Sequence, residues 1–261
     1  MKLEEHIKNI RIRTLKMTYT AQAEHIGSCF SCIEILASLY SSVLDISSSN
    51  CKENYFILSK GHAIAALYST FCEFGYLTEE QIATYCKDGS PLYGEPNYKV
   101  NGIELSTGSL GHGLPVAAGL AYSFKLDNSS KKVFVLVGNG EMNEGSNWET
   151  ILFAAHHKLK NLVLIIDDNN INCNDFSDKI INLKHLNDII TAAGWKVIVV
   201  DGHNSDELIK SFRTPSTEPL CIIAKTIKGK GVSFMENKVE WHNKSPSKKE
   251  YLSALKELEA L

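Results

Sequence analysis

Val137-Gly138-Asn139-Gly140-Glu141 and Asp167-Asp168-Asn169-Asn170-Ile171 are the two stretches of this sequence that decide its fold. Each follows an apolar run, residues 133–137 and 162–166, of the kind that forms a buried strand. Between them, apolar residues with helical spacing predict an amphipathic helix: Trp148, Ile151, Leu152, Ala155 and Leu159. Strand, glycine turn, helix and strand make a βαβ unit, whose two strands are expected to be parallel.

Oxygen-bearing groups follow both strands, at the sheet edge where open α/β proteins bind ligands. The side chains of Asn139 and Asn169 and the backbone carbonyl of Ile171 offer the oxygen ligands that Mg²⁺ prefers. Gly138 and Gly140 let the backbone approach a phosphate beside the next helix N-terminus, although both are also ordinary turn residues. These residues predict a metal-bridged diphosphate site.

Strands and helices alternate along the rest of the chain. Apolar patterns predict strands at 55–58, 195–200 and 220–224, and helices around residues 7–15 and at 32–43, 114–126, 183–193, 205 onward and 248–261. Residues 87–108, rich in Gly, Pro and Asn, are expected to form a long ordered loop. The alternation predicts an α/β fold, a three-layer doubly wound parallel sheet with helices on both faces. Because no linker is visible, residues 1–261 are expected to form a single domain.

Composition excludes several classes of protein. The chain has 261 residues and a formal net charge of −3, which argues against nucleic-acid binding. It opens with charged residues rather than an apolar leader, and no apolar run approaches the roughly 20 residues that cross a membrane. Seven scattered cysteines (29, 32, 51, 72, 86, 173 and 221) predict free thiols in the reducing cytoplasm. Cys29 and Cys32 form a C-x-x-C without a second pair, so we expect core residues rather than zinc ligands.

Five short motifs carry a resemblance to a known family. They are His25-Ile26-Gly27, Leu58-Ser59-Lys60-Gly61-His62, Thr107-Gly108-Ser109-Leu110-Gly111, Gly138-Asn139-Gly140 with Asp168-Asn169 about 30 positions later, and Glu240-Trp241-His242. In order and spacing they resemble the diphosphate-binding half of transketolase, and the fourth resembles the family's thiamine diphosphate signature. The resemblance extends over essentially the whole chain.

The resemblance implies cofactors and site residues. It implies thiamine diphosphate with Mg²⁺ (or Ca²⁺ or Mn²⁺), and it places His25 and Glu95 at the substrate. It implies catalytic roles for His25, His62, His242 and Glu144, cofactor contacts from His62, Gly108, Leu110, Gly138, Asn139, Gly140, Glu141, Asn169, Cys173 and His242, and metal ligation by Asn139, Asn169 and the Ile171 carbonyl. Histidine suits such work because its neutral and charged forms both exist near pH 7. Each of these residues also has a purely structural interpretation. The histidines would be structural residues, Glu144 would be a favourable acidic residue in the first turn of a helix, and Cys173 would be a core residue.

The chain departs from the family pattern at two positions. Asn139 stands where the family has an aspartate ligand, which keeps an oxygen but removes a charge and predicts weaker metal binding. Glu95 stands where the family has a histidine that touches the donor sugar. An ionised carboxylate repels anionic oxygens and cannot donate a hydrogen bond. The departure therefore favours a specialised sugar or an α-keto acid over the usual ketose phosphates.

The resemblance also implies a partner. The family's pyrimidine-binding and C-terminal domains have no counterpart in this chain, so a separate transketolase-like subunit is expected to carry them, with two copies of each chain in the assembly. The complex is expected to transfer a two-carbon ketol or acyl unit from a ketose or α-keto donor to an aldehyde or sugar acceptor, in carbohydrate metabolism. The alternative is a catalytically degenerate scaffold or regulatory subunit that no longer binds the cofactor tightly.

Two weaker patterns remain. Lys228 and Lys230 flank a glycine and resemble a phosphate cradle, but a solvated loop is the favoured interpretation. A dinucleotide-binding protein is disfavoured because no G-x-G-x-x-G follows the first predicted strand.

Overall fold

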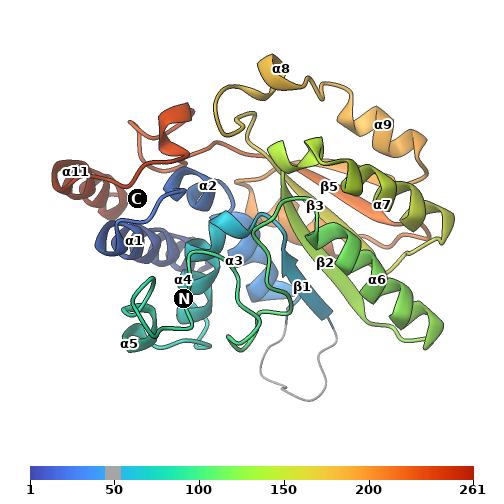
Figure 1. The fold of residues 1–261 in the computed structure, drawn as a ribbon, viewed down its shortest axis with the longest axis horizontal. Helices are drawn as coiled ribbons and strands as arrows, with labels where there is room; N and C mark the ends of the chain where they lie inside the picture. Colours follow the sequence, from blue (N-terminus) through green and yellow to red (C-terminus); the bar gives the residue numbers. More distant parts are fainter. Residues whose placement is uncertain (45–53) are drawn as a thin grey trace.

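The described part of the chain, residues 1–44 and 54–261 of a computed structural model, is built around a five-stranded parallel sheet. Its spatial order is β1-β2-β3-β5-β4 (Figure 1). The strands are β1 (Asn54–Leu58), β2 (Lys132–Gly138), β3 (Leu162–Asp168), β4 (Lys196–Asp201) and β5 (Leu220–Lys225). All predicted strands are therefore present, and the pairing of β2 with β3 is parallel, as the βαβ prediction required.

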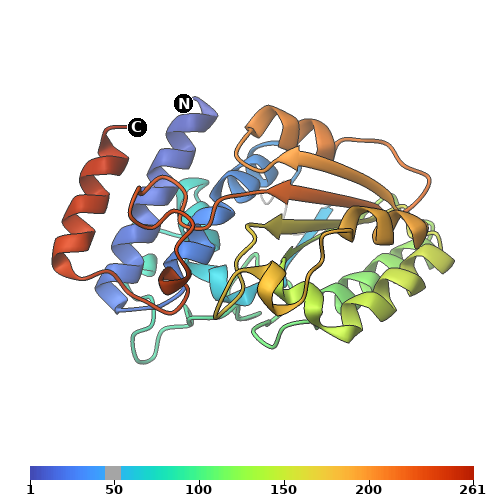
Figure 2. The same cartoon turned by 90° about the horizontal axis from the view of Figure 1, so that it is seen from above.

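Helices cover both faces of the sheet, as Figures 1 and 2 show. On one face, α6 (Gly113–Leu126), α7 (Gly145–His156) and α9 (Leu186–Ala192) share a core with the strands. The other face carries α1 (Leu3–Ala21), α2 (Ile26–Ser31), α3 (Ile33–Ser42), α4 (Ile64–Glu73), α10 (Ser205–Phe212) and α11 (Lys248–Glu259). Short elements complete the fold: η1 (Gly61–Ala63), α5 (Glu79–Ile82), η2 (Gly140–Asn143), α8 (Ser177–Ile180) and η3 (Val239–Trp241). The three-layer α/β prediction is confirmed.

The central strands are apolar along their whole length because both of their faces are covered. In β2, Phe134 and Leu136 point into one core, whereas Val133, Val135 and Val137 point into the other. This alternation explains why the sequence shows continuous apolar runs at these strands rather than every second residue.

The predicted apolar face of α7 is partly wrong. Ile151 is buried, but its neighbours on the buried side are Asn147 and Ala154, and Leu152 is 63% exposed. The helix ends at His156, so Leu159 packs in the core from the following turn. The buried stripe of α7 therefore runs through Asn147, Thr150, Ile151 and Ala154, about one position away from the predicted one.

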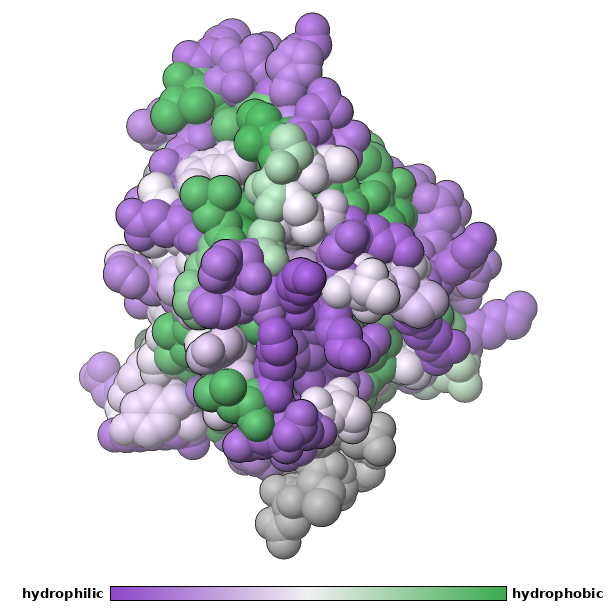
Figure 3. Space-filling model, turned by 90° about the vertical axis from the view of Figure 1, so that its right-hand side faces the viewer, coloured by the Kyte–Doolittle hydropathy of each residue, from purple (hydrophilic) through white to green (hydrophobic). Residues whose placement is uncertain are grey.

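Other predictions can be checked against the fold. Cys29 and Cys32 are fully buried core residues, as expected, and Cys51 lies outside the described residues. None of the described helices is long and apolar enough to cross a membrane. Figure 3, viewed from the side away from the strand carboxyl ends, shows apolar side chains in separate patches among polar ones.

A buried ion pair joins the strand ends. Lys60, just after β1, is paired with Asp167 near the end of β3, and both side chains are almost inaccessible to water. Burial alone would lower the pKa of the Lys60 ammonium and raise that of the Asp167 carboxyl, but the opposite charge outweighs burial in each case. Ser31 of α2 and Thr226 after β5 also donate to Asp167. The pair therefore fixes four segments relative to one another.

We expect Asp167→Ala to lower the free energy of unfolding by about 3–5 kcal/mol, because the Lys60 charge would stay buried without its partner. The matched control is Asp168→Ala, which removes the pair with the exposed Lys225 side chain and is expected to cost about 1 kcal/mol or less. Urea denaturation at pH 7 measures both. Equal losses in the two variants would contradict the role assigned to the buried pair.

The ion pair between Lys60 and Asp167 also makes the stability of the fold depend on pH. Since the folded state lowers the pKa of Asp167, its contribution is present at neutral pH and is lost as pH falls through that lowered pKa.

Candidate functional site

The strand carboxyl ends surround a cavity of about 450 Å³. Its lining brings together twelve of the fourteen predicted residues: His25, His62, Leu110, Gly138, Asn139, Gly140, Glu141, Glu144, Asn169, Ile171, Cys173 and His242. The other two lie beside it. Glu95 lines a neighbouring pocket, and Gly108 lies against the Glu95 carboxylate.

Glu141 holds the glycine turn in place. Its buried carboxylate accepts hydrogen bonds from the Ser59 hydroxyl, from the Gly111 amide at 3.0 Å and from the Gly138 amide at 3.3 Å. Burial raises the pKa of this carboxyl, although these donors act in the opposite direction. Both carboxylate oxygens are thus bonded within the protein, so Glu141 positions the turn that borders the cavity.

Three histidines from distant parts of the sequence meet at the mouth of the cavity. The ring of His25 stacks on that of His62 with centroids 4.6 Å apart and meets the ring of His242 edge-on at 5.1 Å. The His25 amide also donates to the carbonyl of His242 at 3.0 Å. The first, second and fifth sequence motifs are therefore one spatial cluster.

Close backbone packing explains the glycine two residues after His25. A Cβ at Gly27 would lie 2.8 Å from the carbonyl oxygen of Trp241, so only glycine lets α2 pack this tightly against the segment that carries His242. His25 itself has a φ of 69°, which is costly for a residue with a side chain. Such strain persists where surrounding contacts fix it, and it is common at functional sites.

Lys228 is a buried cation in the same cavity, and the prediction of a solvated loop is wrong for it. Its side chain is 1% exposed, and its Nζ lies 2.6 Å from Nδ1 of His242. While Lys228 is protonated its ammonium group can only donate, so Nδ1 of His242 then accepts and the ring proton of His242 is on Nε2. Lys230, two residues later, is only partly buried and lies near Glu236. The sequence spacing of the two lysines could not distinguish these environments.

Burial sets the charge of this cluster. It lowers the pKa of His25 to about 4 and that of His242 to about 3, with neighbouring His62 and Lys228 acting in the same direction. It also lowers the pKa of Lys228 to about 7, helped by the nearby Lys60 charge. The expectation that charged and neutral forms coexist near pH 7 is therefore wrong for His25 and His242, which are neutral hydrogen-bonding groups there.

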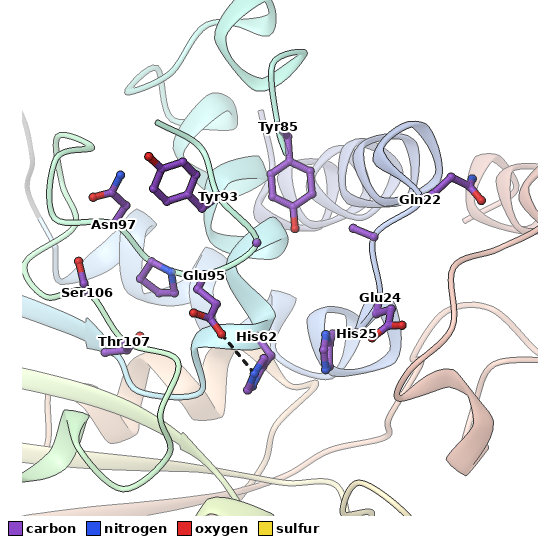
Figure 4. A pocket seen from close by; sticks show the side chains of 13 residues that line it. Gln22, Glu24, His25, His62, Tyr85, Tyr93, Glu95, Asn97, Ser106 and Thr107 are labelled. Atoms are coloured by element: carbon purple, nitrogen blue, oxygen red, sulfur yellow. Dashed lines mark ion pairs between the residues drawn. The ribbon is translucent and has the colours of Figure 1, made fainter. Parts of the chain in front are cut away.

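A second pocket, of about 770 Å³, opens above the histidines and shares His25 and His62 with the cavity. Figure 4 shows Glu95 reaching toward His62, with an Oε1–Nε2 distance of 3.6 Å, and Tyr85 and Tyr93 on the same side. We call this space the outer pocket. A molecule bound in the outer pocket would lie next to the stacked rings of His25 and His62, which also line the cavity.

Residues 3–258 match the family described as "Transketolase, thiamine diphosphate binding domain". The chain belongs to the transketolase family. It is 37% identical to one of the subunits of the apulose-4-phosphate transketolase of Phocaeicola vulgatus, over 98% of this chain and 93% of the relative. It is also 40% identical to human transketolase, over 93% of this chain but only 40% of that protein.

Solved structures agree with this membership. The chain superimposes on the transketolase of Campylobacter jejuni with a TM-score of 0.92 and 27% identity, covering 98% of this chain and 42% of the other. The parallel sheet and the cavity at its carboxyl edge therefore belong to the thiamine diphosphate-binding part of a transketolase.

The residues predicted as metal ligands suit a hard cation. Asn139, Asn169 and Ile171 are all buried and line the cavity together. The Nδ2 of Asn139 donates to Asn172 and Ser177, which leaves its Oδ1 for a cation. This donor set is neutral, so the negative charge that a divalent ion needs would come from the diphosphate itself. The residues fit a metal–diphosphate unit better than a free metal ion.

Two predicted residues are more exposed than the rest. Cys173 is exposed at the edge of the cavity, so the core interpretation is wrong for it. Glu144 is also exposed and stands at the start of α7, where its side chain forms no cap. Both side chains can thus reach a ligand or a partner chain.

Lys60 and Asp167 lie within the quoted motifs, but no role was predicted for either. The sequence did contain a sign of this pair, since a lysine and an aspartate stand at the ends of apolar strands, and buried charges require partners.

We expect pyrophosphate binding at pH 8 to be accompanied by proton uptake, because an anion beside Lys228 raises a pKa that burial has lowered to about 7. Lys228→Met should abolish this uptake and weaken binding about tenfold, roughly the loss of one charge-assisted hydrogen bond. Calorimetry in two buffers of different ionisation enthalpy measures the protons. Lys230→Met is the matched control and should behave as wild type; unchanged uptake in Lys228→Met would contradict this assignment.

Proposed function

We propose that this chain is the diphosphate-binding subunit of an enzyme that transfers a two-carbon ketol unit from a ketose to an aldehyde or sugar acceptor. The observation that carries the proposal is the junction of two spaces at His25 and His62: a cavity suited to a metal-bound diphosphate, and an outer pocket suited to a sugar. The relative from Phocaeicola vulgatus acts, by its name, on apulose 4-phosphate, which supports a sugar phosphate as substrate.

The cavity would hold thiamine diphosphate with Mg²⁺. When bound, this cofactor supplies the carbanion chemistry that such a transfer needs. In this chain, Asn139, Asn169 and the Ile171 carbonyl would ligate the metal, and Lys228 would contact the diphosphate. Gly138 and Gly140 border the same space and let the backbone approach the phosphates.

The histidines would orient the substrate and stabilise charge that develops on its oxygen. While Lys228 is charged, His242 carries its proton on Nε2 and is a neutral donor, and His25 is also neutral. A neutral imidazole can polarise a carbonyl or stabilise a forming alkoxide without a buried positive charge. His62, between His25 and Glu95, is the ring nearest to a carboxylate and is the best placed of the three to exchange a proton with a substrate hydroxyl.

We propose that residues 1–261 form one domain and that a partner chain provides the pyrimidine-binding and C-terminal domains. Two relatives matched over nearly their full length are named as single subunits of a transketolase, which supports this, as does the 40% coverage of human transketolase. Two copies of each chain are proposed, with exposed residues such as Glu144 close to the interface. Because all six described cysteines are free, we propose a cytoplasmic location.

The first test is reconstitution. We expect the purified chain to show no ketol transfer and to gain it when the partner chain, thiamine diphosphate and Mg²⁺ are added together. Turnover is followed by coupled detection of the product aldose and ketose. Full activity of the chain alone would contradict the two-subunit proposal, and a complex that binds no cofactor would instead support the scaffold alternative.

The second test concerns Asn139. We expect Asn139→Asp to tighten Mg²⁺ binding in the presence of thiamine diphosphate about tenfold, because a carboxylate adds a charge to a neutral donor set. The matched control is Asn101→Asp, the same change at an exposed residue that does not line the cavity, and it should leave Mg²⁺ binding unchanged. Calorimetric titration of Mg²⁺ into the complex measures both variants, and equal affinity in wild type and Asn139→Asp would argue against ligation by residue 139.

A further inference from the structure

The outer pocket has an unusual balance of charge. Among its described lining residues, the formal charges are two carboxylates, Glu24 and Glu95, with neither lysine nor arginine opposite them. His25 is neutral there at pH 7 because burial lowers its pKa to about 4. An anionic group entering this pocket would thus approach Glu24 and Glu95, and the other basic side chain there, His62, already lies against Glu95 with a distance of 3.6 Å between Nε2 and Oε1.

The nearest cations line the inner cavity, where each already has a partner. Lys60 is paired with Asp167, and Lys228 lies against His242 at the far side of the histidine cluster. Neither lines the outer pocket. The histidine rings therefore separate a space that attracts a diphosphate from one that disfavours anions.

The loop that carries Glu95 is fixed by hydrogen bonds, and its half-exposed carboxylate lies toward His62. Its loop is fixed by Asn97, whose side chain donates to the Pro91 carbonyl at 3.1 Å and accepts from the Lys99 amide at 3.2 Å. Gly108, with a φ of 149°, leaves room for the Glu95 carboxylate where any Cβ would collide with it. The carboxylate is thereby directed at His62, as Figure 4 shows.

We propose that Glu95 makes this enzyme selective for ketose donors that place only neutral hydroxyl groups beside it, and that it rejects α-keto acids. The carboxylate accepts a hydrogen bond from a donor hydroxyl beside His62, whereas it repels the carboxylate of a keto acid at the same place. This inference rests on the proposed function and chooses between the two donor classes that the sequence left open. A phosphate on the substrate must then lie outside this pocket.

The test compares two donors of the same two-carbon unit, neutral erythrulose and anionic hydroxypyruvate, in the reconstituted complex. Glu95→Gln keeps the size of the side chain and removes its charge, so we expect the ratio of kcat/KM for hydroxypyruvate to that for erythrulose to rise about tenfold. Glu95→Asp keeps the charge and should retain the wild-type preference for erythrulose. Glu80→Gln, an equal change of net charge on exposed α5, is the matched control.

Binding supplies a readout that does not depend on turnover. Saturation-transfer NMR on the complex without thiamine diphosphate measures the affinities of the same two donors, and Glu95→Gln should shift their ratio in the same direction. A complex that turns over neither donor contradicts the proposed function, but a shifted binding ratio would still support the inference. A Glu95→Gln complex with both ratios unchanged overturns it.

Discussion

The site depends on one interaction, the buried ion pair between Lys60 and Asp167. The pair lies where β1 and β3 end, and Lys60 also donates to the carbonyl of Ser28 in α2 at 3.0 Å. A lone charge at this depth would be very costly, so each partner requires the other. Because the strand ends are fixed in this way, the loops after them hold their oxygen atoms and rings at set positions. The ion pair also removes Asp167 from the set of groups free to bind a metal.

The two spaces above this pair differ in charge. The cavity contains Lys228 and the neutral oxygens of Asn139 and Asn169, which suits an anion with its own metal ion. Lys60 and Lys228 accompany the cavity's own carboxylates, Glu141 and Glu144, whereas Glu24 and Glu95 of the outer pocket have no lysine or arginine beside them. His25 and His62 border both spaces, so in the proposed function they would lie between a cofactor on one side and a substrate on the other. The rings of His25 and His62 thereby separate two spaces that differ in charge.

The sequence predicted those features that short-range patterns encode. The strands and the turns at Gly138 and Asn169 were found because apolar runs end abruptly in polar residues, and twelve site residues do meet in one cavity. Burial that depends on distant segments was not predictable in the same way. Lys228 is buried because α2 and the segment before His242 enclose it, and the stripe of α7 is set by packing against neighbours. The spacing of residues within one segment predicts neither the burial of Lys228 nor the buried stripe of α7.

Asn139 is best understood together with Lys228. A divalent ion that meets only neutral protein oxygens has little to hold it until the diphosphate arrives, so metal and diphosphate must strengthen each other's binding. This coupling is reciprocal by thermodynamic necessity. Lys228, with a pKa lowered to about 7, is only partly charged at neutral pH and becomes more fully charged beside an anion, so it repels a metal less beforehand. In the proposed function, a site of this kind would discriminate against metal alone and diphosphate alone, and an asparagine rather than a carboxylate at residue 139 would make that discrimination stronger.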